Sequence, residues 1–194
     1  MKRINNKEEQ KLMKLEKMFD FNYLFGMIDG LTDEAKEAGI TNIVIPKSIN
    51  GILVKQIGIN AFSGCRFIKS ITIPDSVKSI KMGAFSNCTS LENINIPKGI
   101  TNIESFTFSQ CESLTKIIIP EGITHISQCA FNDCKSIKEV ILPDTLKSIG
   151  ILAFADCESL SIMNIPDSLS IVDLKAFQGC PIESTISVAI QNYN

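Results

Sequence analysis

Residues 114–134 read L-T-K-I-I-I-P-E-G-I-T-H-I-S-Q-C-A-F-N-D-C, and this pattern returns along the chain every 23 residues. One phenylalanine marks each copy, and these are Phe62, Phe85, Phe108, Phe131, Phe154 and Phe177. A cysteine follows each phenylalanine three residues later, giving Cys65, Cys88, Cys111, Cys134, Cys157 and Cys180. Prolines keep the same interval at Pro74, Pro97, Pro120, Pro143 and Pro166, and Pro46 precedes them with five extra residues before the next phenylalanine. Three markers in register indicate a chain built from one repeated unit.

Each unit has two kinds of apolar spacing. Ile117 and Ile119 are two residues apart and stand before Pro120, which predicts a short strand ended by a residue without an N–H. Ile123 and Ile126 are three residues apart, which predicts a tight turn or a 3₁₀-like return. One such unit cannot bury its own apolar side, so successive units must stack, with parallel strands about 4.8 Å apart.

Stacking places the marker residues in rows. We expect strands from Ile43–Ile45 to Met163–Ile165, and a seventh at Ile186–Val188. The phenylalanines and the cysteines should form two inward ladders, in which each thiol acts as a small apolar group. Cys129 lies outside the cysteine ladder.

The motif I-x-I-P-x-x-V-x-x-I-x-x-x-A-F-x-x-C, found from Ile71 to Cys88, resembles the BspA-like class of leucine-rich repeats. The resemblance covers roughly residues 40 to 190, with Thr107 in place of alanine and Met163 in place of isoleucine as departures. It implies an α/β repeat fold, a right-handed leucine-rich-repeat solenoid with short parallel strands on the concave face and tight-turn or 3₁₀ returns. Members of the class are commonly bacterial or protist surface proteins implicated in adhesion and host contact.

The ends of a stacked array need covering. We expect residues 1–39 to form a helical N-terminal cap and residues 40–194 to form a solenoid of about seven rungs, as one structural unit. Two helices are predicted for the cap, the second starting after Thr32 and stopping at Gly39. The apolar residues assigned to the first helix are Leu12, Leu15, Met18 and Phe19, and those expected against the first strand are Phe21, Leu24, Phe25 and Ile28. A partner-binding amphipathic helix is the alternative for this segment.

Composition excludes several classes of function. The chain has 194 residues, 19 Lys and Arg against 21 Asp and Glu, and a net charge of −2, so it lacks the basic face that nucleic acid requires. No apolar run is long enough for membrane insertion. No apolar signal segment follows Met1, which predicts a cytoplasmic protein if Met1 is the native start, and a cell-surface or secreted protein if a signal was removed. A monomer is favoured, and an exposed C-terminal edge that pairs with another chain is the alternative.

Catalytic patterns are sparse. No C-x-x-C pair occurs, His125 is the single histidine, and no glycine-rich phosphate loop is present. We therefore expect no enzyme, no cofactor and no metal, with a thiol or metal enzyme as a remote alternative.

The residues between the buried positions of the strands should face outward and bind a partner. These candidate partner-binding residues are Thr72, Asn93, Asn95, Lys116, Ile118, Glu139, Ile141, Ile162 and Asn164. Ile118, Ile141 and Ile162 should form an apolar patch rimmed by Lys116 and Glu139, and exposed contiguous apolar surface tends to mark a contact site. Strand propensity alone would also favour these isoleucines. The predicted function is a non-enzymatic protein–protein interaction module that binds a protein through its concave strands, and the alternative is a cell-surface adhesin.

Overall fold

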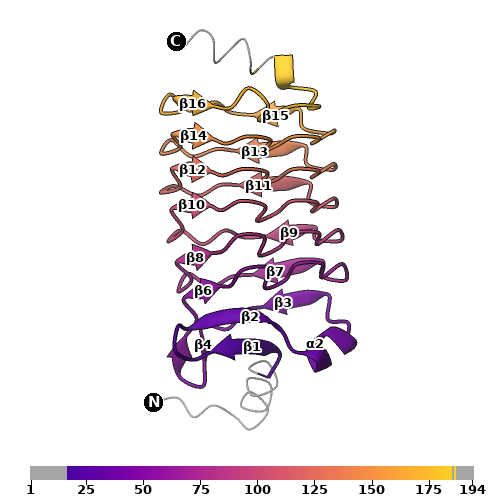
Figure 1. Cartoon of the computed structure of the whole chain (residues 1–194), viewed down its shortest axis with the longest axis vertical. Helices are drawn as coiled ribbons and strands as arrows, with labels where there is room; N and C mark the ends of the chain where they lie inside the picture. The colour runs from indigo at the N-terminus through magenta and orange to yellow at the C-terminus, as the bar shows by residue number, and fades with distance from the viewer. Residues whose placement is uncertain (1–16, 185, 187–194) are drawn as a thin grey trace.

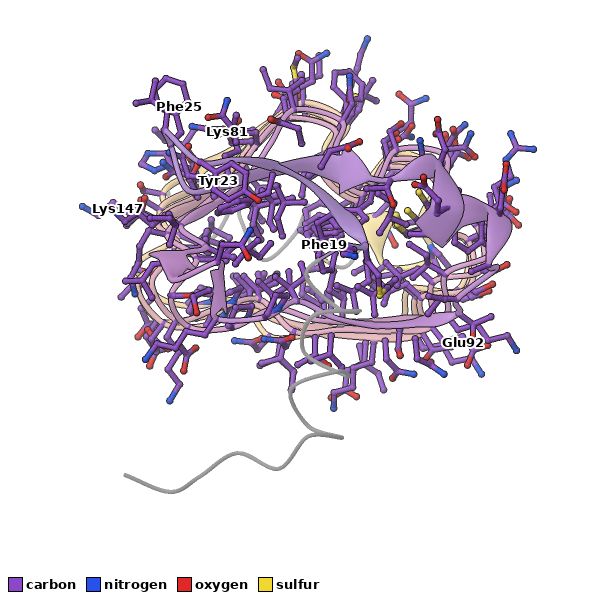
Figure 2. All side chains as sticks on the ribbon, turned by 90° about the horizontal axis from the view of Figure 1, so that it is seen from below. Phe19, Tyr23, Phe25, Lys81, Glu92 and Lys147 are labelled. Atoms are coloured by element: carbon purple, nitrogen blue, oxygen red, sulfur yellow. The ribbon has the colours of Figure 1, made fainter. Side chains whose placement is uncertain are left out.

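The computed structural model describes residues 17–184 and 186, and the chain forms a parallel-strand β-solenoid with little helix (Figure 1). The turns follow one another from the N-terminal end at the bottom of Figure 1 to the C-terminal end at the top. Seen along its long axis, the ribbons of successive turns lie nearly on top of one another (Figure 2). The repeat stacking predicted from the sequence is therefore confirmed.

One side of the solenoid carries a strand from each turn. These strands are β3 (Asn42–Val44), β7 (Ser70–Thr72), β9 (Asn93–Ile94), β11 (Lys116–Ile118), β13 (Glu139–Ile141) and β15 (Ile162–Met163). Their pairing is parallel, and Ile117 lies opposite Val140 because both occupy the same place in the repeat. We call their outer surface the strand face. Its strands begin one residue earlier than predicted. The concave position of this face and the right-handed sense stay predictions.

The return segment of each turn is also a strand. These strands are β6 (Gln56–Ile57), β8 (Ser79–Ile80), β10 (Asn102–Ile103), β12 (His125–Ile126), β14 (Ser148–Ile149) and β16 (Ile171–Val172). They pair in parallel, and we call their outer surface the return face. The prediction of a 3₁₀-like return was wrong here, because the N–H and C=O groups pair with the next turn instead of within the segment. Tight turns do follow the prolines, as where Val77 N donates to Pro74 O.

The third side holds the two predicted ladders. Neighbouring phenylalanine rings stack with centroids 5.0–5.5 Å apart and planes within 15° of parallel. Each cysteine from the second copy onward donates its S–H to the carbonyl of the phenylalanine one repeat earlier, as Cys134 does to Phe108 at 3.1 Å. Both ladders are buried.

The described part of the chain begins with a β-hairpin, so the prediction that Phe19 belongs to a helix was wrong. β1 (Phe19–Asn22) pairs antiparallel with β2 (Met27–Leu31), and β2 continues the return sheet by pairing with β6. Phe19 of β1 and Ile28 of β2 are buried in the core. Leu24 and Phe25, which we expected against the first strand, are exposed at the tip of the hairpin.

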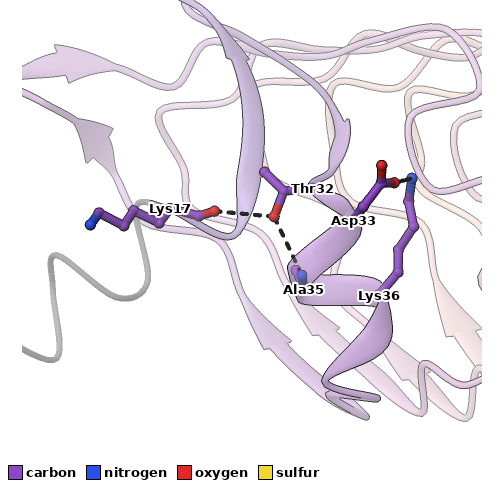
Figure 3. A network of polar contacts seen from close by, with 5 residues as sticks. All are labelled: Lys17, Thr32, Asp33, Ala35 and Lys36. Carbon is purple, nitrogen blue, oxygen red and sulfur yellow. Dashed lines mark hydrogen bonds and ion pairs between the residues drawn. The ribbon is translucent and has the colours of Figure 1, made fainter.

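A short helix does follow at the predicted place. α2 (Asp33–Glu37) begins after Thr32, whose hydroxyl accepts a hydrogen bond from Ala35 N (Figure 3). Gly39, with φ +59°, lies just past its C-terminal end, as a left-handed stop requires.

The five extra residues near Gly51 form a second hairpin, β4 (Ser48–Ile49) with β5 (Ile52–Leu53). The predicted first helix falls almost entirely outside the described residues, and so do residues 187 and 188 of the predicted seventh strand. Ile186 is described, and its N–H donates to Ile182 O, which is a helical bond rather than a strand pairing.

Both faces divide into two sheets at the same step of the stack. β3, β7 and β9 form one sheet and β11, β13 and β15 another; likewise β8 ends one return sheet and β10 begins the next. The segments that carry the ladder phenylalanines remain hydrogen-bonded to each other across this step. Phe85 N donates to Thr107 O at 2.9 Å, and Asn87 N donates to Ser109 O at 2.7 Å. Glu104 bridges it too, since its carboxylate accepts from Met82 N at 2.8 Å and pairs with Lys81. We call this step the seam.

Candidate interaction surface

The predicted apolar patch lies on the strand face. Ile118 is opposite Ile141 in the register of β11 and β13, and Ile162 follows Glu139 in the neighbouring column. The side chain of Ile118 is 57% exposed and that of Ile162 is 58% exposed, whereas Ile141 is half-buried. The structure therefore brings the three isoleucines together on one surface.

The predicted rim is an ion pair. Lys116 Nζ lies 2.7 Å from Glu139 Oε2, and the two residues are opposite each other in the parallel register. Similar pairs join residues one repeat apart elsewhere, as with Lys69 and Glu92. These exposed pairs contribute little to stability.

The side chains of two candidate residues, Asn95 and Asn164, form hydrogen bonds with the neighbouring turn. Asn95 Oδ1 accepts from Ile73 N at 2.7 Å, and Asn95 Nδ2 donates to Ile73 O at 2.8 Å. Asn164 makes the same two bonds with Leu142, at 2.8 and 2.9 Å. Their amides continue the hydrogen bonding between turns where the strand ends, so they are structural as well as exposed. Thr72 and Asn93 are exposed on the same face.

The buried thiols of Cys88 and Cys134 are poorly suited to chemistry. Burial raises the pKa of Cys88 and of Cys134 to about 12, so both remain protonated near neutral pH. Burial also raises the pKa of Cys129, which stands outside the ladder. His125 is exposed, with its Nδ1 2.7 Å from Thr124 Oγ1.

Among the described residues, no three His, Cys, Asp or Glu side chains come together in a way that could hold a metal ion. The helical segments of residues 17–184 are all too short or too polar to cross a bilayer.

Two further exposed apolar regions were missed from the sequence. Tyr23, Leu24 and Phe25 protrude from the tip of the β1–β2 hairpin, and Ile171 protrudes from β16 on the return face. The alternation of Phe19, Asp20 and Phe21 was the signal for the hairpin. It was outweighed by the helical spacing of the residues just before it.

Comparison with solved structures identifies similar solenoids. A leucine-rich repeat protein from Bacteroides ovatus matches with a TM-score of 0.74 and 35% identity, over 84% of this chain and 43% of that one. A leucine-rich repeat protein of T. pallidum matches with a TM-score of 0.71 and 28% identity, over 80% of this chain and 79% of that one. A leucine-rich cell surface protein from Faecalibacterium prausnitzii matches with a TM-score of 0.60 and 37% identity, over 64% of this chain and 32% of that one. The chain thus spans less than half of the length of the Bacteroides protein.

Sequence comparison gives the family. A comparison with curated proteins found no match. A sequence model of the BspA type leucine-rich repeat region matches six copies over residues 55–183, which is well over half of the chain. The repeats, the two ladders and this match together place the chain in the BspA-type leucine-rich repeat family.

Proposed function

We propose that this protein is a non-enzymatic interaction module that binds a protein partner on the strand face. The observation that supports it is the apolar patch of Ile118, Ile141 and Ile162, held on paired strands and bordered by the Lys116–Glu139 ion pair. Strands fix these side chains before binding, so little conformational entropy is lost when a partner covers them. The protonated, buried thiols favour binding over thiol catalysis.

The patch is tested by making it charged. Ile118 and Ile162 are both more than half exposed, so Ile118→Asp together with Ile162→Asp should leave the fold intact. Ile141 is left unchanged because it is half-buried. Burying one isoleucine is worth about 1.5–3 kcal/mol, so the double variant should weaken partner binding by at least about a hundredfold.

The measurement is capture from lysates and surface extracts of the source cell, with the wild-type chain, the double variant and a control. Ile59→Ser is the control, because Ile59 is equally exposed but lies after β6, away from the strand face. Thermal unfolding confirms that all three chains fold. A partner retained by the wild type and the control and lost by the double variant supports the proposal. Equal retention by the double variant would reject it.

A cell-surface role is the second candidate. It is supported by the Faecalibacterium prausnitzii relative, which is described as a leucine-rich cell surface protein and is 37% identical over 64% of this chain. Labelling intact source cells with a membrane-impermeant reagent distinguishes a surface module from an internal one.

A further inference from the structure

The tip of the β1–β2 hairpin is a rigid apolar projection. Asn22 Oδ1 accepts hydrogen bonds from the N–H groups of Leu24 and Phe25, at 3.1 and 3.4 Å. Tyr23 Oη accepts from Asn50 Nδ2 at 2.8 Å, which ties the tip to the β4–β5 hairpin. Leu24 is nevertheless 83% exposed. Apolar side chains held outward in this way are typical of contact residues.

The tip is also fixed to the body of the solenoid. Gly26 O accepts from Lys55 N at 2.7 Å and from Gln56 N at 3.2 Å. Gly26 has φ +61°, and a side chain there would collide with the carbonyl oxygen of Leu53, so glycine is required at this close approach. Figure 2 shows Tyr23 and Phe25 on the side of the molecule away from Glu92, which precedes β9 of the strand face. The tip therefore belongs to the return face.

The other end of the return face has an apolar groove. The groove has a volume of about 580 Å³ and spans β12, β14 and β16, with Gly150, Ile151 and Leu174 along it. Ile171 lines it and is 66% exposed. Its place in the repeat is polar in every earlier turn, and those residues are Gln56, Ser79, Asn102, His125 and Ser148. An isoleucine where the five earlier repeats carry a polar residue indicates a local contact that the repeat itself does not require. At the other end of the same column, Met27 of β2 lies opposite Gln56.

The two ends of the solenoid carry opposite charge. Residues 17–100 contain nine Lys and Arg and seven Asp and Glu, a net charge of +2, whereas residues 101–184 contain five Lys and eleven Asp and Glu, a net charge of −6. The same contrast is found locally, because Lys55 lies at the base of the tip and Asp173 lines the groove. A basic N-terminal half and an acidic C-terminal half are complementary when two copies lie antiparallel.

The tip and the groove lie on one face of the same rigid body, several turns apart, so the tip cannot reach the groove of its own chain. We infer that the return face binds a second copy of this chain in an antiparallel, two-fold symmetric dimer, in which each tip enters the partner's groove. Such an arrangement makes the same contact twice and lays each basic end over an acidic end. The sequence alone favoured a monomer, and the exposed tip and groove are the reason for departing from that expectation.

The experiment measures self-association of the full chain by sedimentation equilibrium from micromolar to sub-millimolar concentration. The wild type should show a monomer–dimer equilibrium. Leu24→Asp alters the tip and Ile171→Asp alters the groove, and each change affects both tip–groove contacts of the symmetric dimer. Either variant should raise the dimer dissociation constant by at least about tenfold. Leu24→Lys combined with Ile171→Asp places opposite charges in each contact and should restore much of the association.

Ile118→Asp is the matched control, because it charges the strand face and should leave the dimer unchanged. This control also separates the dimer from the proposed partner site, since either can fail while the other holds. A wild-type chain that stays monomeric over the whole range would overturn the inference. So would a dimer that is insensitive to Leu24→Asp and Ile171→Asp, or one that the charge-paired double variant fails to restore.

Discussion

The thiols of the cysteine ladder stabilise the fold only while they are protonated. In the folded chain the S–H of Cys134 donates to the carbonyl of Phe108 one repeat earlier, and burial raises the pKa of Cys134 from an ordinary value of 9.0 to about 12. A group whose pKa is raised on folding contributes its full stability below its unfolded value and loses it as the pH rises toward the folded value. For Cys88 and Cys134 this window runs from pH 9.0 to about 12.

We therefore expect the free energy of unfolding to fall as the pH is raised above 9.0. Cys88 and Cys134 should each contribute a slope of up to about 1.4 kcal/mol per pH unit within this window. Urea unfolding at several pH values measures the slope, and Cys134→Ala should make it shallower while lowering stability at every pH. An identical slope in the variant would show that the thiol does not carry the effect.

Residue spacing was enough to predict these two ladders, because a fixed interval in a stacked chain places equal residues in rows. Spacing could not show that the amide of Asn95 turns back to pair with Ile73. The sequence places Asn95 on the outer surface, but whether an exposed amide binds water, a partner or the neighbouring turn depends on the backbone groups beside it.

On the strand face, the start of each strand was predicted to within one residue, whereas the strands of the return face were missed. A strand with apolar residues two apart has a visible period, as Ile117 and Ile119 show. The return strands are only two residues long, as in Ser79–Ile80, so no alternation can be seen in them. Their identity comes from pairing with the neighbouring turn, which is a tertiary effect.

Where β9 ends, the side-chain amide of Asn95 takes the place of the backbone hydrogen bonds between strands, and this structural role can be tested. Asn95→Ala removes both hydrogen bonds to Ile73 and should lower the free energy of unfolding by about 1–2 kcal/mol. Asn93→Ala is the matched control, since Asn93 is an exposed asparagine on the same strand and outside the amide pair. Denaturant unfolding of both variants measures the difference, and equal stability would refute the structural role of Asn95.

At the scale of the whole molecule, stability depends on each turn contacting the next. Phe108 is fully buried between two rings, whereas Phe177 stacks on Phe154 at the C-terminal end of the ladder. Phe108→Ala should therefore cost about 3–5 kcal/mol, as expected for removing a buried ring, and Phe177→Ala clearly less. Chemical denaturation compares the two, and equal losses would mean that the turns do not support one another in sequence.

The seam has a consequence for how such an array changes its length. Elsewhere, a new repeat inserted between two turns would have to break one strand pairing on each face. It would then have to pair with the turn on either side of it. At the seam, the turn with β8 and β9 is followed by the turn with β10 and β11. There β8 and β10 already belong to separate sheets, and so do β9 and β11. An extra copy inserted there would disturb the phenylalanine turns and the bonds of Glu104 while leaving every existing sheet whole. Growth or shortening by whole repeats is thus least disruptive at the centre of the molecule.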